Sequence, residues 1–331
     1  MGSRTDSLWY GKSPLSLMLA PLGWLYCAGA VLRRAAYRSG LLRAGRVGAP
    51  VVVVGNISVG GTGKTPLVVW IAELLQSGGL RPGIVSRGYL GRADKWPQQV
   101  RPDSDPIMVG DEPVLLAAAT GCPVAADPDR LRAAQSLLTH FDCDVIISDD
   151  GLQHLRLGRD VEIAVVDGIR RHGNGRCLPA GPLREPVSRL ASVDLVVANG
   201  GGIPGEFTME MRIEGVRNLG RDEPPGRLES FDACPVHAVC GIGSPERFFA
   251  TLEHAGLTVI RHPFPDHHAF GPADIAFDDD YPVLMTEKDA VKCRRFADTR
   301  HWCVTVRAVL VEAFAAELMA LLGAPREEPN P

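Results

Sequence analysis

Short runs of β-branched residues alternate with longer helical patterns over most of the chain. Uninterrupted apolar runs are typical of strands covered on both faces, and their alternation with helices predicts parallel strands joined by crossover helices. Strands are predicted at 51–54, 83–86, 123–126, 145–148, 162–166 and 194–198. Helices are predicted at 64–75, 112–119 and 129–140. The pattern therefore predicts an α/β fold with a mostly parallel sheet.

The pattern changes after residue 206. Residues 207–219, FTMEMRIEGVRNL, alternate apolar and polar side chains like a strand with one solvent-facing side. The Gly-, Pro- and charge-rich residues that come next predict a linker at 216–231. A smaller α/β unit follows, with strands predicted at 236–240, 258–261, 283–286 and 302–306 and helices at 245–255 and 310–322. We thus expect a first domain at 46–215, a second at 232–322 and a frayed tail at 323–331.

Residues 1–45 contain an apolar stretch. Twenty residues without a charge, SPLSLMLAPLGWLYCAGAVL, lie between Lys12 and Arg33, which is long enough to span a bilayer if helical. On a helix, large and small side chains separate onto two faces: Leu15, Leu19, Leu22 and Tyr26 on one, and Ser16, Ala20, Gly23 and Cys27 on the other. We expect a membrane-associated helix in the interface, with Arg33, Arg34 and Arg38 reaching anionic head groups. A buried first helix and a true span are the alternatives.

Charge and cysteine usage extend this picture. The net charge is −4, but residues 1–50 hold seven basic and one acidic side chain, so they carry +6 and the remainder −10. The heavier basic flank follows the apolar stretch, which places the folded part on the cytoplasmic side. The eight cysteines show no CxxC pair and no zinc-ligand spacing, which predicts reduced thiols. We expect a globular protein with no nucleic-acid partner, and the oligomeric state stays open.

Residues 51–70, VVVVGNISVGGTGKTPLVVW, place a glycine-rich turn between a predicted strand and a helix. This is the order of parts in a P-loop, where backbone amides and a helix N-terminus hold phosphate oxygens. Lys64 can reach the β- and γ-phosphates, and the Thr65 hydroxyl can bind Mg²⁺. Ser58 replaces the first glycine of the general motif, and Val59 stands where GGxGK ATPases carry an extra lysine. We expect ATP at Ser58, Val59, Gly60, Gly61, Thr62, Gly63, Lys64 and Thr65.

Acidic side chains follow another buried strand, in DVIISDDGLQH at 144–154. A P-loop needs such carboxylates to hold magnesium, directly or through water. Asp149 and Asp150 lie at the carboxyl edge of this strand and are the candidates. Arg184 and Glu185, in the proline-stiffened PAGPLREP segment, suit phosphate and metal contacts.

Phosphate transfer to an alcohol also needs a group that orients or deprotonates the hydroxyl. VGDEPVLLA places Asp111 at a helix start, where the alternative role is an N-cap. PFPDHHAF offers His267 and His268 beside Asp266. A histidine next to a carboxylate can form a dyad, although loop histidines are usually solvated.

Six segments together resemble the tetraacyldisaccharide 4′-kinase family, the lipid A 4′-kinases: VGNISVGGTGKTP, SRGYLGR, VGDEP, SDDGLQH, PAGPLREP and LMTEKDAVK. The similarity extends from about residue 10 to about residue 322. It implies an enzyme that moves the γ-phosphate of ATP to the 4′-hydroxyl of a tetraacylated glucosamine disaccharide 1-phosphate. The product would be lipid IVA, formed on the cytoplasmic face of the bacterial inner membrane.

The resemblance also implies roles for individual residues. Ser58 is usual for the family's P-loop, and Asp111 falls on its proposed base. The family's Asp-His pattern falls on Asp266 and His267, so His267 is expected as the partner of Asp111. Asp149, Asp150, Glu185 and Thr65 are expected around Mg²⁺, with Lys64 and Arg184 on phosphate. Closure of the second domain would complete the site and exclude water.

Three other functions share parts of this pattern. A nucleotide-switch ATPase of the GGxGK type would hydrolyse ATP without an acceptor. A small-molecule kinase or ligase on the same fold would have no use for an amphipathic basic N-terminus. A membrane-bound scaffold with a degenerate P-loop is the third, and the intact Lys64, Thr65, Asp149 and Asp150 argue against it.

Overall fold

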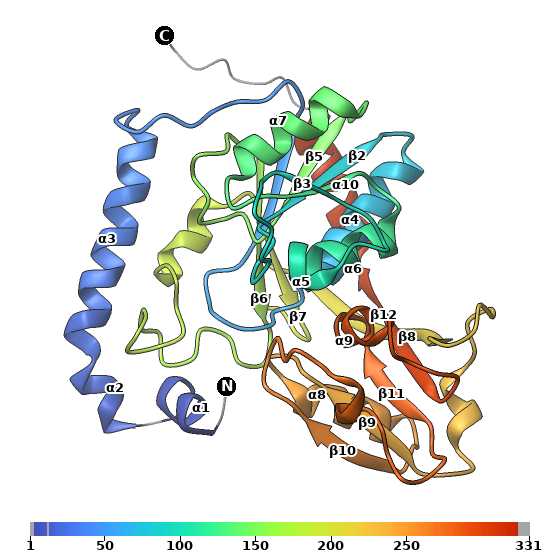
Figure 1. Cartoon of the computed structure of the whole chain (residues 1–331). Coiled ribbons are helices and arrows are strands. Elements are labelled where there is room, and N and C mark those ends of the chain that lie inside the picture. Colours follow the sequence, from blue (N-terminus) through green and yellow to red (C-terminus); the bar gives the residue numbers. More distant parts are fainter. Residues whose placement is uncertain (1–2, 12, 324–331) are drawn as a thin grey trace.

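The predicted α/β fold is confirmed by the structure, a computed structural model that describes residues 3–11 and 13–323. Apart from Gly323, the predicted tail lies outside these residues. The strands of the described chain form one twelve-stranded sheet in the order β10-β9-β11-β12-β8-β7-β6-β1-β5-β2-β4-β3. Figure 1 shows the sheet running from a larger α/β part down to a smaller lobe that carries the helices α8 (Pro245–His254) and α9 (Glu287–Cys293).

The strand that leads into the P-loop lies inside the parallel part of the sheet. Its strands are β1 (Val51–Gly55), β2 (Pro82–Ser86), β4 (Val124–Ala126), β5 (Val145–Asp149), β6 (Val161–Asp167) and β7 (Leu195–Asn199). β1 pairs in parallel with β5 and β6. The short strand β3 (Gln98–Val100) closes this edge of the sheet by antiparallel pairing with β4. Because β1 and β5 are parallel neighbours, the loops that follow them leave from the same ends of the strands and lie close together.

Both faces of this part are covered, as the uninterrupted valines predict. Alternate residues of β1 point to opposite faces: Val52 and Val54 enter the core cluster that includes Leu67 and Phe314, whereas Val51 and Val53 pack with Leu137. The first face is covered by α4 (Lys64–Ser77), α6 (Asp111–Thr120) and α10 (Glu312–Gly323), and the second by α7 (Arg130–His140). The short helix α5 (Pro106–Val109) precedes α6.

Two long strands join the parallel part to the smaller lobe. β8 (Phe207–Asn218) pairs in parallel with β7 and antiparallel with β12 (His301–Leu310), with a register shift between Thr305 and Val306. The strand predicted at 302–306 is therefore only the middle of β12, because pairing with β8 extends it. For the same reason, residues 216–218 of the predicted linker belong to β8, and the last helix begins at Glu312 instead of 310. The domain division itself stays a prediction.

The smaller lobe has its own buried clusters on the two faces of its strands. Its regular elements are β9 (Val236–Cys240), α8 (Pro245–His254), β10 (Val259–Pro263), β11 (Val283–Thr286) and α9 (Glu287–Cys293). The predicted strands and the helix at 245–255 are confirmed, whereas the pattern did not predict α9. Short 3₁₀ turns, η1 (Val187–Ser192), η2 (Leu228–Phe231) and η3 (Pro272–Asp274), connect other elements.

The N-terminal segment forms α1 (Ser3–Trp9), α2 (Pro14–Met18) and α3 (Ala20–Arg38), and Figure 1 shows α3 along one side of the molecule. The predicted separation of faces is confirmed where the small residues lie inward. Ser16, Ala20 and Gly23 are buried, and a β-carbon added at Gly23 would lie 2.8 Å from the Cys177 carbonyl oxygen.

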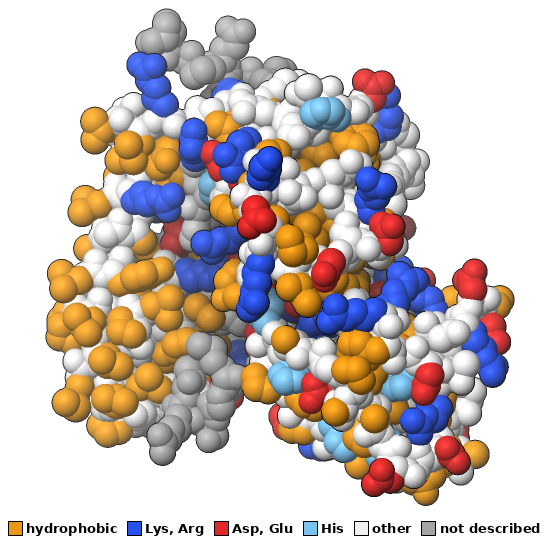
Figure 2. Space-filling view, viewed as in Figure 1, with side chains coloured by type: hydrophobic (Ala, Val, Ile, Leu, Met, Phe, Trp, Pro, Cys, Tyr) orange, Lys and Arg blue, Asp and Glu red, His pale blue; other side chains and the backbone are white. Residues whose placement is uncertain are grey.

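The large apolar residues of α2 and α3 point outward. Figure 2 shows them gathered over this side of the molecule, and Met18, Trp24 and Leu25 have 70% or more of their surface exposed. Within residues 3–11 and 13–323, no helix combines the length and apolarity needed to cross a bilayer.

Two of the arginines expected at lipid head groups also contact the folded chain. Arg33 donates to the Gln153 carbonyl oxygen at 3.0 Å, and Arg34 donates to the Ser192 hydroxyl at 3.2 Å. The small-residue face brings α3 close enough to the larger α/β part for these side chains to reach it. Both hydrogen bonds lie at the surface, so the expectation that Arg33 and Arg34 also reach lipid head groups stays a prediction.

Candidate active site

The glycine-rich turn after β1 has the backbone shape that a phosphate-binding loop requires. Gly60 and Gly63 have φ of +110° and +94°, a region that residues with a β-carbon rarely adopt. Gly63 also precedes the first turn of α4. Side chains fix the turn from inside, because Asn56 donates to the Thr62 hydroxyl at 3.1 Å and Asn199 donates to the Thr62 carbonyl oxygen at 3.2 Å.

The predicted PAGPLREP segment lies directly against the start of this loop. The amide of Val59 donates to the Pro182 carbonyl oxygen at 2.8 Å, and the amide of Arg184 donates to the Ile57 carbonyl oxygen at 2.7 Å. Ser58 forms an antiparallel bridge with Leu183 between these two bonds. The segment therefore acts as a short additional strand that supports the P-loop and brings Arg184 beside it.

Asp150 links the basic residues of the two loops. Its carboxylate lies 3.6 Å from Lys64 Nζ and 2.9 Å from the guanidinium of Arg184. Burial acts to raise the pKa of Asp150, but the charges of Lys64 and Arg184 outweigh it and lower the pKa to about 2. The predicted phosphate contacts Lys64 and Arg184 are thus brought together around one carboxylate.

Asp149, the preceding residue, is in a different environment. It is fully buried at the end of β5, and its Oδ1 has no hydrogen-bond partner among the described residues. Burial, together with the charges of Glu112 and Asp150, raises its pKa to about 7. A buried carboxylate oxygen without a partner, close to a P-loop lysine, fits a divalent cation because the cation would satisfy it.

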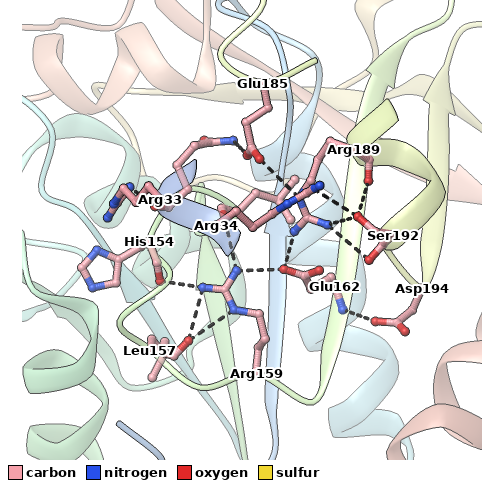
Figure 3. Close-up of polar contacts among 12 residues, drawn as sticks. Arg33, Arg34, His154, Leu157, Arg159, Glu162, Glu185, Arg189, Ser192 and Asp194 are labelled. Carbon is pink, nitrogen blue, oxygen red and sulfur yellow. Dashed lines mark hydrogen bonds and ion pairs between the residues drawn. The ribbon is translucent and has the colours of Figure 1, made fainter. Parts of the chain in front are cut away.

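Glu185 belongs to a buried network that Gln153 connects to Arg184 (Figure 3). It accepts a hydrogen bond from Gln153 at 2.8 Å and lies 3.4 Å from Nε of Arg189. Arg189, 2% exposed, also binds Glu162 at 2.5 Å, and Arg159 binds the same Glu162 at 2.8 Å. Among the described residues, no group of three or more His, Cys, Asp or Glu side chains is arranged to hold a metal ion.

The predicted dyad joins a residue of the larger α/β part to a residue of the smaller lobe. Asp111, the first residue of α6, is 6% exposed, and its Oδ2 lies 3.1 Å from Nδ1 of His267. Burial acts to raise the pKa of Asp111, but the hydrogen bond from His267 and the charges of Lys288 and Lys292 outweigh it and lower the pKa. Asp111 is thus held ionised at neutral pH.

The loop that carries His267 lies next to the P-loop. A β-carbon added at Gly243, which follows β9, would lie 3.4 Å from the amide nitrogen of Gly61 and 3.3 Å from a carboxylate oxygen of Asp266. The ring of Tyr89, from the SRGYLGR segment, lies 5.1 Å from the ring of His267. Of the two histidines, His268 instead contacts Asp274 at 3.1 Å.

The glycine-rich loop, the carboxylate of Asp149 and the Asp111–His267 pair thus lie near one another. The comparison with known proteins gives this chemistry a family. Residues 15–323 match the family described as tetraacyldisaccharide-1-P 4′-kinase. The chain belongs to this family.

Individual members of the tetraacyldisaccharide 4′-kinase family are similar over nearly the whole chain. The tetraacyldisaccharide 4′-kinase of Nitrosococcus oceani is 52% identical over 314 residues, which cover 95% of this chain and 93% of the relative. That of Alkalilimnicola ehrlichii is 55% identical, with 92% and 93% covered. A crystal structure of the "apo" form of LpxK from Aquifex aeolicus in complex with ATP at 2.2 Å resolution has a TM-score of 0.80 and 28% identity. The match covers 93% of this chain and 99% of the chain in that crystal structure.

The structure of this tetraacyldisaccharide 4′-kinase family member adds two residues to the predicted site. Gln153 donates to the Asn56 carbonyl oxygen at 3.0 Å as well as to Glu185. Lys288 lies 3.2 Å from Nε2 of His267. Gln153 and Lys288 lie in the segments SDDGLQH and LMTEKDAVK, which carry part of the family resemblance. Their partners lie far away along the chain, so no local sequence pattern indicated these contacts.

Proposed function

We propose that this chain transfers the γ-phosphate of ATP to the 4′-hydroxyl of a tetraacyldisaccharide 1-phosphate, which forms lipid IVA in lipid A biosynthesis. The observation that carries the proposal is the contact between Asp111 and His267 beside an intact P-loop, in a chain of this family. The contact joins residues 156 positions apart in the sequence. It supplies what a P-loop alone lacks, a group that can receive a proton from an alcohol.

ATP binding falls to the P-loop and its neighbours. The backbone amides from Ser58 to Thr65 and the N-terminus of α4 would hold the phosphate oxygens, and Lys64 and Arg184 would contribute positive charge. Thr65, Asp149 and Asp150 are proposed to hold Mg²⁺, which when bound neutralises charge on the phosphates. Glu185, already bound by Gln153 and Arg189, would act by fixing the Gln153 side chain beside Asn56.

Asp111 is proposed to accept the proton of the 4′-hydroxyl. Its Oδ1 already accepts the amide of Glu112 at 2.9 Å and its Oδ2 accepts from His267. These donors keep the carboxylate ionised and fix its direction. Because the transition state of phosphoryl transfer is loose, orienting the hydroxyl matters as much as removing its proton.

The exposed apolar face of α2 and α3 is proposed to bring the site to its lipid substrate at the cytoplasmic face of the inner membrane. An acylated disaccharide leaves a bilayer at a cost of roughly 0.8 kcal/mol per CH₂. An enzyme that lies on the membrane surface avoids most of this cost. The outward Trp24, Leu25 and Met18 side chains are of the type that inserts at such an interface.

The test uses ATP labelled in the γ-phosphate, with and without a tetraacyldisaccharide 1-phosphate in detergent. We expect label in the lipid, and little phosphate release without it. Asp111→Asn should lower kcat by roughly 10²- to 10⁴-fold with little change in the KM for ATP. Asp103→Asn, an exposed acid on the preceding loop, is the matched control. ATP hydrolysis that is independent of the lipid, or full turnover by Asp111→Asn, would refute the proposal.

A further inference from the structure

Lys288 is a largely buried lysine that contacts Glu112, the second residue of α6, and His267, the partner of Asp111. It lies in the first turn of α9 and its side chain is 17% exposed. Its Nζ lies 3.2 Å from Nε2 of His267 and 3.2 Å from Oε1 of Glu112, the residue after Asp111. Asp111, His267, Lys288 and Glu112 therefore form a closed chain of contacts that begins and ends on α6.

The backbone around Lys288 is fixed to the backbone of His267. Thr286 and Asp289 bond each other at the start of α9, and Asp289 accepts the amide of Gly241 at 2.9 Å. The carbonyl oxygen of the same Gly241 accepts the amide of His267 at 3.2 Å. One residue thus ties the helix that carries Lys288 to the loop that carries His267, which sets the distance between the two side chains.

The contact with Lys288 also determines which nitrogen of His267 carries the proton. An ammonium group has donors and no acceptor, so Nε2 of His267 must accept. Nδ1 then carries the hydrogen that His267 donates to Asp111. Burial acts to lower the pKa of Lys288, but Glu112, Asp111 and Asp266 outweigh it and raise the pKa, so the ammonium persists at neutral pH.

We propose that Lys288 is a positioning residue for phosphate transfer: it holds His267 in the tautomer and orientation that present Nδ1–H to Asp111. The inference rests on the proposed function, in which Asp111 receives the proton of the acceptor hydroxyl. Lys288 acts through His267 and does not itself touch the reacting atoms. Glu112 and Asp266 fix Lys288, because its ammonium lies within 3.6 Å of both carboxylates.

The charges that face Asp111 give the proposal a pH signature. From the smaller lobe, His267 favours the carboxylate by donating a hydrogen bond, and Lys288 and Lys292 favour it by their positive charge; Glu112 and Asp266 oppose them. Loss of Lys288 removes one of the cations that lower the pKa of Asp111, so that pKa rises. The acidic limb of the kcat/KM profile then moves to higher pH.

The experiment compares Lys288→Met with Lys292→Met in the full chain, each alone and combined with His267→Ala. We expect Lys288→Met to lower kcat roughly 10- to 100-fold, as outer-shell partners of active-site histidines do, and to shift the acidic limb to higher pH. In the His267→Ala background its further effect on kcat, measured at a pH above the acidic limb, should fall below about twofold, because its contact with the imidazole ring is gone. Nζ of Lys292 lies 3.9 Å from Oδ2 of Asp111 and 2.8 Å from Asp289, so it acts on Asp111 directly and its effect should persist there.

Three controls keep the outcomes distinct. Lys95→Met, at an exposed lysine, should leave turnover and the pH profile unchanged. Lys288→Arg, which keeps charge and donors, should restore part of the rate. A ¹⁵N-histidine NMR spectrum, with His267 assigned by the His267→Ala variant, should show the Nδ1–H tautomer in the unmodified chain.

The results separate this inference from the proposed function. If Asp111→Asn is inactive while Lys288→Met keeps full activity and an unchanged pH profile, the role of Lys288 is refuted and the base assignment stands. Equal effects of Lys288→Met with and without His267 also refute it, and so does an Nε2–H tautomer. Full activity of Asp111→Asn instead overturns the proposed function, and the NMR tautomer still decides the contact with Lys288.

Discussion

Replacement of Arg189 by methionine should destabilise the protein through two carboxylates at once. Arg189 is 2% exposed and lies against both Glu162 and Glu185 (Figure 3). Methionine fills a similar length of apolar space but brings no charge. The change therefore leaves two buried carboxylates with one fewer cation, while Arg159 and Gln153 remain as their other partners.

The size of the effect follows from this geometry. Breaking a buried ion pair by removing one partner costs about 3–5 kcal/mol, and the remaining partners place the expected loss near the lower limit, about 3 kcal/mol. A loss of this size corresponds to a fall in Tm of roughly 4 °C for a chain of 331 residues. The assay is urea denaturation followed by circular dichroism, with Arg212→Met as the control, because Arg212 pairs with Glu210 on the surface.

The effect should depend on pH. Burial acts to raise the pKa of Glu162, but the hydrogen bond from Arg189 and the charges of Arg159 and Arg189 outweigh it and lower the pKa. A lowered carboxyl pKa stabilises the fold above the unfolded pKa of about 4.3, and this stability is lost as the pH falls through the folded pKa. The difference between Arg189→Met and the unmodified chain should therefore be largest at pH 7 and narrow near pH 4.

A second change tests the cause. Glu162→Gln combined with Arg189→Met removes one of the uncompensated carboxylates, so the double variant should be less destabilised than the sum of the two single changes. Strict additivity, or a loss in Arg189→Met no larger than that of Arg212→Met at both pH values, would refute the reasoning.

Two further predictions concern the P-loop and the exposed face of α3. A β-carbon in Gly63→Ala would lie 2.6 Å from the Asn199 amide nitrogen at a φ of +94°, so the KM for ATP should rise at least about tenfold, with unaltered KM counting against the P-loop assignment. Trp24→Asp with Leu25→Asp removes two exposed apolar side chains, each worth about 1.5–3 kcal/mol when buried in lipid. Sedimentation with anionic vesicles should show that this double variant binds at least about 100-fold more weakly than the unmodified chain. Ile203→Asp, at another exposed apolar residue, should leave binding unchanged, and equal binding by the double variant, the control and the unmodified chain would exclude this face.

The sequence was sufficient for those parts of the fold that a local pattern defines. The run of valines before Gly55 defined a strand buried on both faces, and the glycines before Lys64 defined the turn. Ser16, Ala20 and Gly23 defined a small-residue face of the N-terminal helices because small residues recur there at helical spacing. Each of these features depends on residues within a few turns of one another.

The parts that were missed depend on pairing between distant segments. The length of β12 depends on β8, which lies some 90 residues earlier in the chain, as the Thr305 contact with Gly215 shows. The contacts of Arg33 and Arg34 depend on how closely α3 packs, which spacing alone does not give. Lys288 resembles any helix-surface lysine in the sequence, and only the fold brings it to His267.

The packing of α2 against the PAGPLREP segment has a mechanical consequence. Ser16 donates to the Ala180 carbonyl oxygen at 2.7 Å, and Val59 of the P-loop donates to the Pro182 carbonyl oxygen at 2.8 Å. Only Gly181 separates these two acceptors, and neighbouring α-carbons are held about 3.8 Å apart. So short a link has almost no slack. A force that pulls α2 away from the body of the protein is transmitted to the start of the phosphate loop, so load on the exposed helices and the shape of the nucleotide site are mechanically coupled.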